Sequence, residues 1–315
     1  MIKVSVIICT RNRLDELKKS LQRVLNQKFK NYEVIVVDNA STDVSIKDYV
    51  QKMSKISKKL KYISAPKKPN LPYARNVGLK YAKGEIIAFI DDDSFVSKNW
   101  IKEVVNCFKD ESVGAAGGRV VIPRNSNLFE NEYLKSKGLK RFFYEMFALF
   151  IDYYGKPGSI KNSGQVVAFF DYKKFIYIDH VWGCNMFFRK DALERAGGFD
   201  EAYENYPLRE DTDMCVRIKK LGYKILFNPK AKVFHKLSRK EVFPRMNFYY
   251  RNKHHIYFVF KNKLIKGFSG WIKFILQQIS EVLFYFLYSM IKNKPSILID
   301  SFKGKIDGFR TIKYL

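Results

Sequence analysis

The chain has 315 residues, of which 47% are hydrophobic and 16% aromatic, and this composition excludes an intrinsically disordered protein. Its 58 Lys and Arg against 31 Asp and Glu give a net charge of +27, which indicates a polyanionic partner such as nucleic acid, an anionic membrane surface or a phosphorylated substrate. The four cysteines form no CxxC pair, so the sequence favours a reducing compartment over a disulfide framework or a zinc site.

Strand and helix signals alternate through the first 110 residues. Residues 3–9 predict a β-strand, and because no small-residue cleavage site follows them we expect no signal peptide. Continuous apolar strands that alternate with helices are typical of a parallel sheet covered on both faces. Further strands are expected at residues 33–38, 60–64 and 85–91, and helices at residues 13–27, 70–84 and 98–110.

Polar side chains gather at the carboxyl ends of three predicted strands. Open parallel sheets bind ligands at that edge, so the sequence predicts a shared site there, with a nucleotide as its occupant. The residues are Thr10, Arg11 and Asn12 after the first strand, Asp38 at the end of the second, and Asp91, Asp92 and Asp93 after the fourth.

The three consecutive carboxylates at 91–93 need a compensating cation. Adjacent like charges repel, and their removal from water is costly when nothing neutralises them. Oxygen ligands suit Mg²⁺ or Mn²⁺, and such a cation can also hold a substrate diphosphate. The alternative is a solvated turn that caps the next helix, but the two other polar strand ends beside it favour a metal.

Other candidate residues each have a structural alternative. Asp38 can accept a hydrogen bond from a base or ribose, or can form a turn. Arg75, near a helix N-terminus, can bind a phosphate or lie on the surface. Glu210 and Asp211 can include a general base, or can simply favour the helix that they begin. His235 can complete a metal site or stabilise the end of a strand.

Residues 124–180 interrupt the alternating pattern. They are rich in Phe, Tyr and Lys, and we interpret them as an insertion or an acceptor-side cover. Regular structure resumes with a strand and a short helix within residues 180–201. A helix follows at residues 209–222, and then two short strands broken at residues 228–229.

The segment from residue 236 onward is strongly basic, with sixteen Lys and Arg against four Asp and Glu. Residues 271–291 are long and apolar enough to cross a bilayer. Their polar residues share one helical face, which favours a helix lying in the membrane interface, while a membrane span and packing on the catalytic domain stay open as alternatives. That polar face carries Lys273, Gln277, Ser280 and Glu281, and the preceding His254 and His255 are expected at the surface or the interface.

Five ordered segments resemble the signatures of family 2 glycosyltransferases of the GT-A fold. The resemblance implies an α/β GT-A domain over residues 1–235, with a Rossmann-like, mostly parallel sheet flanked by helices. The acceptor region at about 124–180 and a basic, membrane-associated helical extension over residues 236–315 fall outside the signatures. The segments are "VSVIICTRNR", "VIVVDNASTD", "ARNVGLKYAKGEIIAFIDDDS", "GCNMFFRKDALERAGGFDE" and "REDTDMCVR".

The same resemblance implies an enzyme of the hexosyltransferase type, EC 2.4, that transfers a sugar from a nucleotide-diphosphate donor with inversion and with the help of Mg²⁺ or Mn²⁺. Asp91 and Asp93 match the outer carboxylates of its DxD motif, with Asp93 as the direct metal ligand and Asp91 nearer the ribose. His235 would be a further metal ligand. Asp211 would be the catalytic base, and Glu210 would hold acceptor or donor hydroxyls.

The resemblance also assigns residues to the two substrates. Thr10, Arg11, Asn12, Asp38, Arg75 and Asp92 would bind the donor nucleotide, and Trp182, Cys184 and Asn185 would lie where the donor sugar meets the acceptor. The expected partners are a nucleotide-sugar donor, a glycan or lipid-linked saccharide acceptor, and the anionic cytoplasmic face of the cell membrane.

Two other functions compete with this reading. A sugar-nucleotide pyrophosphorylase-like nucleotidyltransferase would need a glycine-rich phosphate loop after the first strand, and "CTRNRLDE" contains no glycine. A basic nucleic-acid-binding protein would explain the charge, but a carboxylate-rich site repels phosphates without a metal. We therefore expect no nucleic-acid partner.

Overall fold

The computed structural model describes residues 3–67, 69–122, 137–138, 156–167, 170–235 and 248–313. The chain divides into two compact units, one formed by Met1–Ile122 with Phe170–Lys236 and the other by Pro123–Phe169 with Leu237–Leu315. Much of the segment interpreted as an insertion, including the aromatic run at residues 141–155, lies outside the described residues.

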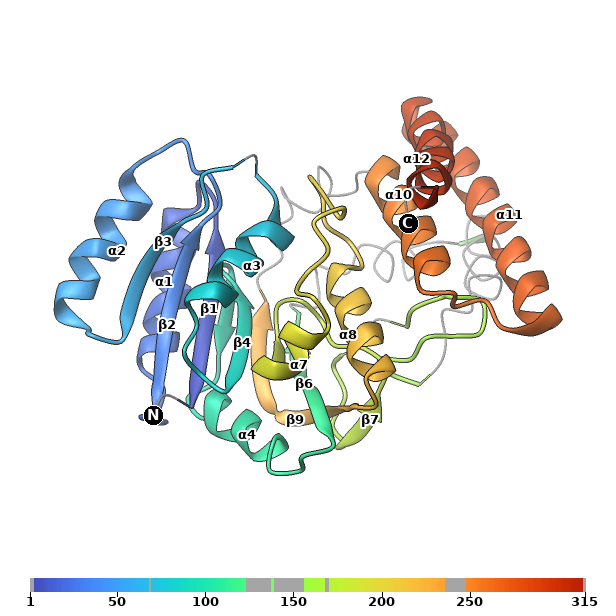
Figure 1. Ribbon diagram of the computed structural model, residues 1–315. Helices are drawn as coiled ribbons and strands as arrows, with labels where there is room; N and C mark the ends of the chain where they lie inside the picture. Colours follow the sequence, from blue (N-terminus) through green and yellow to red (C-terminus); the bar gives the residue numbers. More distant parts are fainter. Residues whose placement is uncertain are drawn as a thin grey trace. The chain divides into compact units, whose positions relative to one another are not determined.

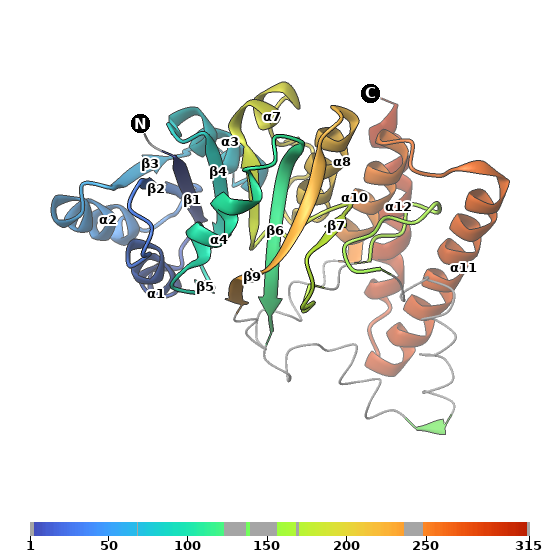
Figure 2. The same cartoon turned by 90° about the horizontal axis from the view of Figure 1, so that it is seen from below.

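In the described residues, the first unit is built on a nine-stranded sheet in the order β3-β2-β1-β4-β8-β6-β9-β5, with β7 paired to β9 (Figure 1). Parallel pairing joins β1 to β2 and β4, and joins β6 to β9, which lie side by side in Figure 2. The predicted α/β, mostly parallel sheet is confirmed. The strands are β1 Val4–Thr10, β2 Tyr32–Asp38, β3 Leu60–Ser64, β4 Ile86–Asp91, β5 Ser94–Val96, β6 Val113–Val121, β7 Ile176–Ile178, β8 Met186–Arg189 and β9 Lys224–His235.

Helices cover both faces of this sheet because its apolar strands point side chains alternately to either side. On β1, Val6 and Ile8 pack in the cluster formed with α1, α2 and α4, whereas Ile7 packs with α3, α7 and α8. The helices are α1 Leu14–Leu25, α2 Ser45–Ile56, α3 Leu71–Tyr81, α4 Trp100–Cys107, α7 Lys190–Arg195 and α8 Glu210–Lys220.

The prediction of two short strands broken at residues 228–229 is wrong, because β9 is one strand with an internal irregularity. Its register against β6 shifts between Gly118 and Val120 and resumes at Val233. The Asn228 side chain holds this point by donating to the carbonyl oxygen of Glu103 at 2.9 Å. A Cβ atom on Gly118 would lie only 1.9 Å from the carbonyl oxygen of Ala231, so the close approach of the two strands requires glycine.

The described part of the second unit contains α10 Phe248–Lys261, α11 Gly267–Lys292 and α12 Ser296–Ile312. Two glycines let α12 approach the α10 backbone closely. A Cβ atom on Gly304 would lie 2.1 Å from the carbonyl oxygen of Tyr249, and one on Gly308 would lie 2.7 Å from that of Lys253. Helix α11 is long and apolar enough to cross a membrane, judged by length and composition alone.

The expectation that His254 and His255 lie at a surface or an interface is wrong, because both rings are buried within the second unit. His255 lies 3.5 Å from the Nε2 atom of Gln277 on α11, and the ring of His254 contacts Tyr250. Asn252, His254 and His255 of α10 therefore face the interior of the unit, whereas Arg251 is exposed.

Candidate functional site

The pairing of strands brings the predicted polar rim together. Thr10 pairs with Asp38 across β1 and β2, and Cys9 pairs with Asp91 across β1 and β4, so three strand ends meet at one edge. The short strand β5 then pairs Ser94 with His235 at the end of β9. This antiparallel pairing explains how a histidine 142 residues away in the chain reaches Asp93.

Two of the three consecutive carboxylates are buried and are neutralised by the chain itself. Asp92 accepts a hydrogen bond from Thr10 Oγ1 at 2.7 Å and lies 3.0 Å from Arg13 Nη1. Asp93 lies 2.6 Å from Arg13 Nη2 and 3.0 Å from His235 Nε2. One guanidinium group thus bridges both carboxylates, and the sequence analysis did not identify this role of Arg13.

Burial and charge divide the pKa values of this pair. Burial raises the pKa of Asp92 to about 7, although the nearby charge of Arg13 opposes the shift. Burial also acts on Asp93, but hydrogen bonds and charge from His235 and Arg13 hold its pKa well below the usual range. Asp93 is therefore the ionised member of the pair.

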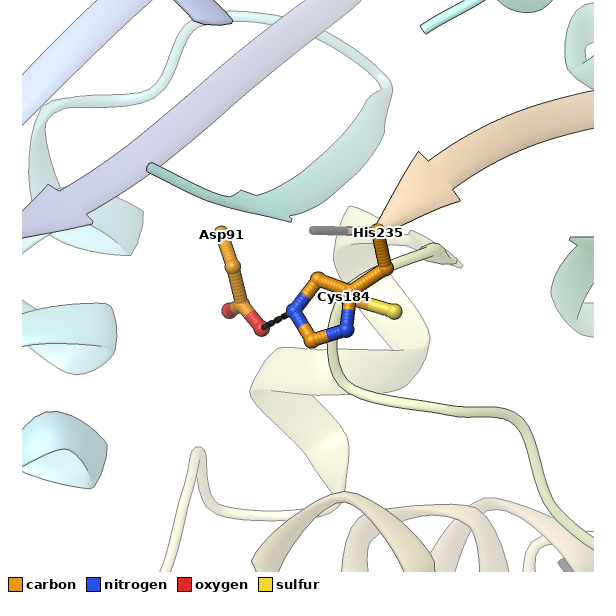
Figure 3. Close-up of side chains that lie close together, drawn as sticks. All are labelled: Asp91, Cys184 and His235. Atoms are coloured by element: carbon orange, nitrogen blue, oxygen red, sulfur yellow. Dashed lines mark ion pairs between the residues drawn. The ribbon is translucent and has the colours of Figure 1, made fainter. Parts of the chain in front are cut away.

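The third carboxylate, Asp91, joins a cluster that can hold a cation. One ligand atom each from Asp91, Cys184 and His235 lies within 4.8 Å of the others. Figure 3 shows the three side chains close together. The Oδ2 atom of Asp91 is 3.8 Å from His235 Nε2. These side chains come from the end of β4, the segment before β8 and the end of β9.

The donor types of this cluster fit Mg²⁺ or Mn²⁺ through oxygen and imidazole nitrogen. Burial, followed by the charges of Asp91, Asp93 and Asp211, raises the pKa of the Cys184 thiol far above its usual range. A protonated thiol is a poor ligand for these hard cations. Asp91 and His235 therefore fit a divalent cation, and Asp93, the expected direct ligand, lies beside them with its Oδ1 atom 3.0 Å from His235 Nε2.

Arg75 links this cluster to the start of α8. Its buried guanidinium lies 2.8 Å from Glu210 Oε1 and 3.8 Å from Asp91 Oδ1. Burial raises the pKa of Glu210 to about 7, with a further contribution from the charge of Asp211, while Arg75 opposes the shift. The structure thus places Arg75 at the predicted site, as a cation shared between two carboxylates.

Asp211 is held in one orientation by two backbone amides. Gly183 N donates to its Oδ2 atom at 2.7 Å, and Thr212 N donates to its Oδ1 atom at 2.6 Å. A Cβ atom on Gly183 would lie 3.1 Å from Arg75 Nη2 and 3.3 Å from Asp211 Oδ2. Glycine at this position therefore lets the backbone lie directly against the charged groups, and the sequence analysis did not single it out.

The three residues expected where donor sugar and acceptor meet occupy different environments. Trp182 is half-buried, stacks on Phe170 with ring centroids 5.6 Å apart, and has its ring 6.1 Å from that of His235. Asn185 is fully buried. Its Oδ1 atom accepts from Trp100 Nε1, and its Nδ2 atom donates to Ala231 O, each at 2.9 Å. These bonds favour a positioning role for Asn185 over contact with a sugar.

Four of the residues expected to bind the donor nucleotide lie at the ends of β1 and β2 or directly after β1, namely Thr10, Arg11, Asn12 and Asp38. Asp38 accepts from Ser41 N and from the Tyr62 hydroxyl, each at 2.9 Å, so the turn considered as its alternative role is present. Asn12 Oδ1 accepts from Thr42 N at 2.9 Å, which ties the two loops together. Arg11 is exposed at the same edge.

Comparison with known proteins identifies the family. Residues 5–197 match the family model described as glycosyl transferase family 2, and residues 164–241 match one described as the N-terminal domain of galactosyltransferase. Among solved structures, the mannosyltransferase PcManGT from Pyrobaculum calidifontis in complex with GDP-Man and Mn²⁺ aligns with a TM-score of 0.59 at 16% identity, over 97% of this chain and 85% of that one. S. aureus TarS 1–349 in complex with UDP aligns with a TM-score of 0.52 at 16% identity, over 88% and 70%.

Curated relatives match over parts of their length. A glucosyl-dolichyl phosphate glucuronosyltransferase of Haloferax volcanii is 23% identical over 75% of this chain and 70% of that protein. A GalNAc(5)-diNAcBac-PP-undecaprenol beta-1,3-glucosyltransferase of Campylobacter jejuni is 32% identical over 45% of each. The chain covers only 24% of the uncharacterized protein y4gI of Sinorhizobium fredii. Because the first family model matches well over half of its residues, the chain belongs to glycosyl transferase family 2.

Proposed function

We propose that this chain is an inverting glycosyltransferase that moves a sugar from a nucleotide-diphosphate donor to a hydroxyl group of a glycan or lipid-linked acceptor, with a bound divalent cation. The observation that carries the proposal is the convergence of a cation-binding pair, a buried arginine and an oriented carboxylate. Asp91 lies 3.8 Å from both His235 and Arg75, and Arg75 and Asp211 both lie against the backbone of Gly183.

The diphosphate of the donor would bind between the metal position and Arg75. Asp91 and His235 would hold Mg²⁺ or Mn²⁺, and Arg75 would orient the phosphates. The cation, when bound, offsets the negative charge that develops on the departing nucleoside diphosphate. Arg75 supplies the same kind of electrostatic help from the chain, and Glu210 fixes its position. The Mn²⁺ and GDP-Man of the Pyrobaculum structure support this arrangement through the fold alone.

Asp211 would act as the general base. As the acceptor oxygen forms its bond to the anomeric carbon, the carboxylate takes the hydroxyl proton, and the bond from that carbon to the diphosphate breaks on the opposite side. This single displacement inverts the anomeric configuration. The hydrogen bonds from Gly183 and Thr212 leave the carboxylate little rotational freedom, which favours a positioned base.

The acceptor that we favour is a lipid-linked saccharide at the cytoplasmic face of the membrane. Two relatives carry a dolichyl phosphate or a PP-undecaprenol acceptor in their names. The net charge of +27 suits an anionic surface, and α11 is apolar enough to associate with one. We propose residues 1–235 as the catalytic domain and residues 236–315 as the membrane-associated extension.

The test is sugar transfer by the purified chain across UDP-, GDP- and dTDP-sugars with Mn²⁺, beside donor affinity measured by calorimetry. Asp211→Asn should keep donor affinity within about twofold and lower transfer by at least about 100-fold, because only the proton acceptor is lost. Equal losses of affinity and transfer would refute the base assignment. Asp91→Asn and His235→Gln should each abolish the response to Mn²⁺, and an unchanged response would refute the metal pair.

A further inference from the structure

The polarity of α11 is inverted relative to a helix of a water-soluble unit. Such a helix buries its large apolar side chains and exposes its polar ones. In α11 the buried positions are mostly small or polar, whereas the large apolar side chains point outward. The buried residues are Gly270, Phe274, Gln277, Ser280, Tyr285 and Ser289, and the exposed apolar ones include Trp271, Ile275, Ile279, Leu283, Phe286 and Met290.

Helix α12 repeats the inversion. It buries Ile297 near its start, but its other buried residues are Ser301, Gly304 and Gly308, while Phe302 and Ile306 are 44% and 50% exposed. Across the described residues, fourteen of the twenty exposed large apolar side chains belong to these two helices. Single exposed apolar residues are ordinary on a protein surface. A continuous apolar face on two helices, however, indicates contact with a membrane or another protein.

The buried charges between the helices are paired from within the second unit, although Gln277 Oε1, Gln278 Nε2 and Ser301 Oγ have no hydrogen-bond partner among the described residues. Lys305 on α12 lies 2.7 Å from Glu281 Oε2 on α11 and also donates to Gln278. The Nε2 atom of Gln277 donates to Gln165 Oε1 at 2.6 Å. Charges that are paired and hydrogen-bonded in this way tolerate removal from water, so the helix pair can leave the aqueous phase without stranding an ion.

Two observations favour lipid as the occupant of this face. A groove with a volume of about 440 Å³ lies between the helices, and its lining includes Leu283, Phe302 and Ile306. Exposed cations accompany the apolar face, as anionic headgroups require. They are Lys273, Lys292, Lys294, Lys303, Arg310 and Lys313.

The same two helices are poorly suited to crossing the bilayer. The middle of α11 carries Gln277, Gln278 and Glu281, and its polar side packs inward. With 17 residues, α12 is about 25 Å long, short of the hydrocarbon thickness of about 30 Å. It also carries Lys303 and Asp307 within its length. A position parallel to the surface avoids the burial of these groups.

We propose that α11 and α12 form a monotopic hairpin that embeds its apolar face in one leaflet of an anionic bilayer without crossing it. The inference goes beyond the location proposed above, because α12 inserts together with α11 and because the paired interior groups permit it. It stands on the burial pattern of the second unit and is independent of the sugar-transfer chemistry.

Vesicle flotation of the full chain tests insertion by both helices. We expect binding to vesicles that contain phosphatidylglycerol, and about tenfold weaker partitioning for Ile306→Glu and for Phe302→Glu, since each places a charge in the apolar face. Ile56→Glu is the matched control, because Ile56 is 75% exposed on α2 in the first unit, and it should bind as the unsubstituted chain does. Unchanged partitioning of both α12 variants would overturn the hairpin.

Thiol labelling tests the topology. In vesicle-bound protein, Lys266→Cys and Lys294→Cys flank α11, and a membrane-impermeant maleimide added outside should label both, above the background of the unsubstituted chain. Protection of only one of the two would indicate a span and overturn the monotopic arrangement. Calorimetry with a nucleotide sugar and Mn²⁺ separates the two proposals, because Ile306→Glu should lose vesicle binding and keep donor binding. If Ile306→Glu lost both vesicle binding and donor binding, the substitution would act on more than the helix pair, and the inference would be overturned.

Discussion

Arg13 offers the sharpest test of how the acidic strand end is stabilised. Its guanidinium lies 3.0 Å from Asp92 and 2.6 Å from Asp93, and both carboxylates are buried. Substitution of Arg13 by glutamine leaves two adjacent carboxyl groups in a poorly solvated place, and no other described residue then forms an ion pair with Asp92. We therefore expect Arg13→Gln to destabilise the metal-free protein strongly.

The size of the effect follows from the geometry. At an effective dielectric constant of about 20, Coulomb's law gives roughly 6 kcal/mol for Arg13 and the ionised Asp93, whose nearest atoms are 2.6 Å apart. Most of this attraction offsets the cost of desolvation, and removal of one partner of a buried pair costs about 3–5 kcal/mol in practice. Because Thr10 and His235 keep their hydrogen bonds to the two carboxylates, we expect the lower limit, about 3 kcal/mol. That loss corresponds to a fall in Tm of roughly 6–12 °C for a domain of this size.

The assay is thermal and denaturant unfolding of Arg13→Gln beside Arg11→Gln, with and without Mn²⁺. Arg11 is an exposed arginine two residues away and supplies a matched loss of charge, for which we expect a change below about 0.5 kcal/mol. Mn²⁺ should stabilise Arg13→Gln more than the unsubstituted chain, because the added cation neutralises the same cluster. Equal destabilisation by the two substitutions would refute the reasoning.

Three further substitutions test single contacts. Gly183→Ala should lower turnover more than stability, because its Cβ would press on Arg75 Nη2 at 3.1 Å, and steady-state kinetics beside a melting curve measures both. The pKa of Glu210 rises from 4.5 to about 7 on folding, so the protonated carboxyl stabilises the folded state at low pH. This contribution to the unfolding free energy is about 3 kcal/mol at most, and it is lost as the pH rises from about 4.5 through 7. Glu210→Gln should flatten the fall in unfolding free energy between pH 5 and pH 8, and an unaltered slope would argue against the buried carboxyl. Cys184→Ser should keep the Mn²⁺ dependence of transfer within about twofold, and loss of that dependence would make the thiol a metal ligand.

The elements predicted most accurately are those whose local pattern agrees with their burial. The strand expected at residues 60–64 is β3 to the residue, and Asn70 caps α3 by accepting from Tyr73 N at 3.1 Å. Helix α2 went unpredicted although its signal was present, because Ile46 and Val50 stand four residues apart and are both buried.

Strand β6 had no comparable signal. Its sequence, VGAAGGRVV, is rich in glycine and alanine, which have low strand propensity. These small residues are selected by neighbours that come from distant parts of the chain. A Cβ atom on Gly117 would lie 2.5 Å from Val181 Cγ1, and one on Gly118 would meet the backbone of β9. A strand whose small residues are required by distant neighbours can be recognised only from the tertiary structure.

The acidic strand end shows the same limit at the level of the site. Repulsion among Asp91, Asp92 and Asp93 correctly required a cation, and the donor chemistry pointed to a metal. In the structure, Arg13 supplies the positive charge beside Asp92 and Asp93. Asp91 is partly exposed and faces His235. Charge balance fixes how much positive charge a buried cluster needs, but only the fold determines which carboxylate the chain neutralises itself and which it leaves for a ligand.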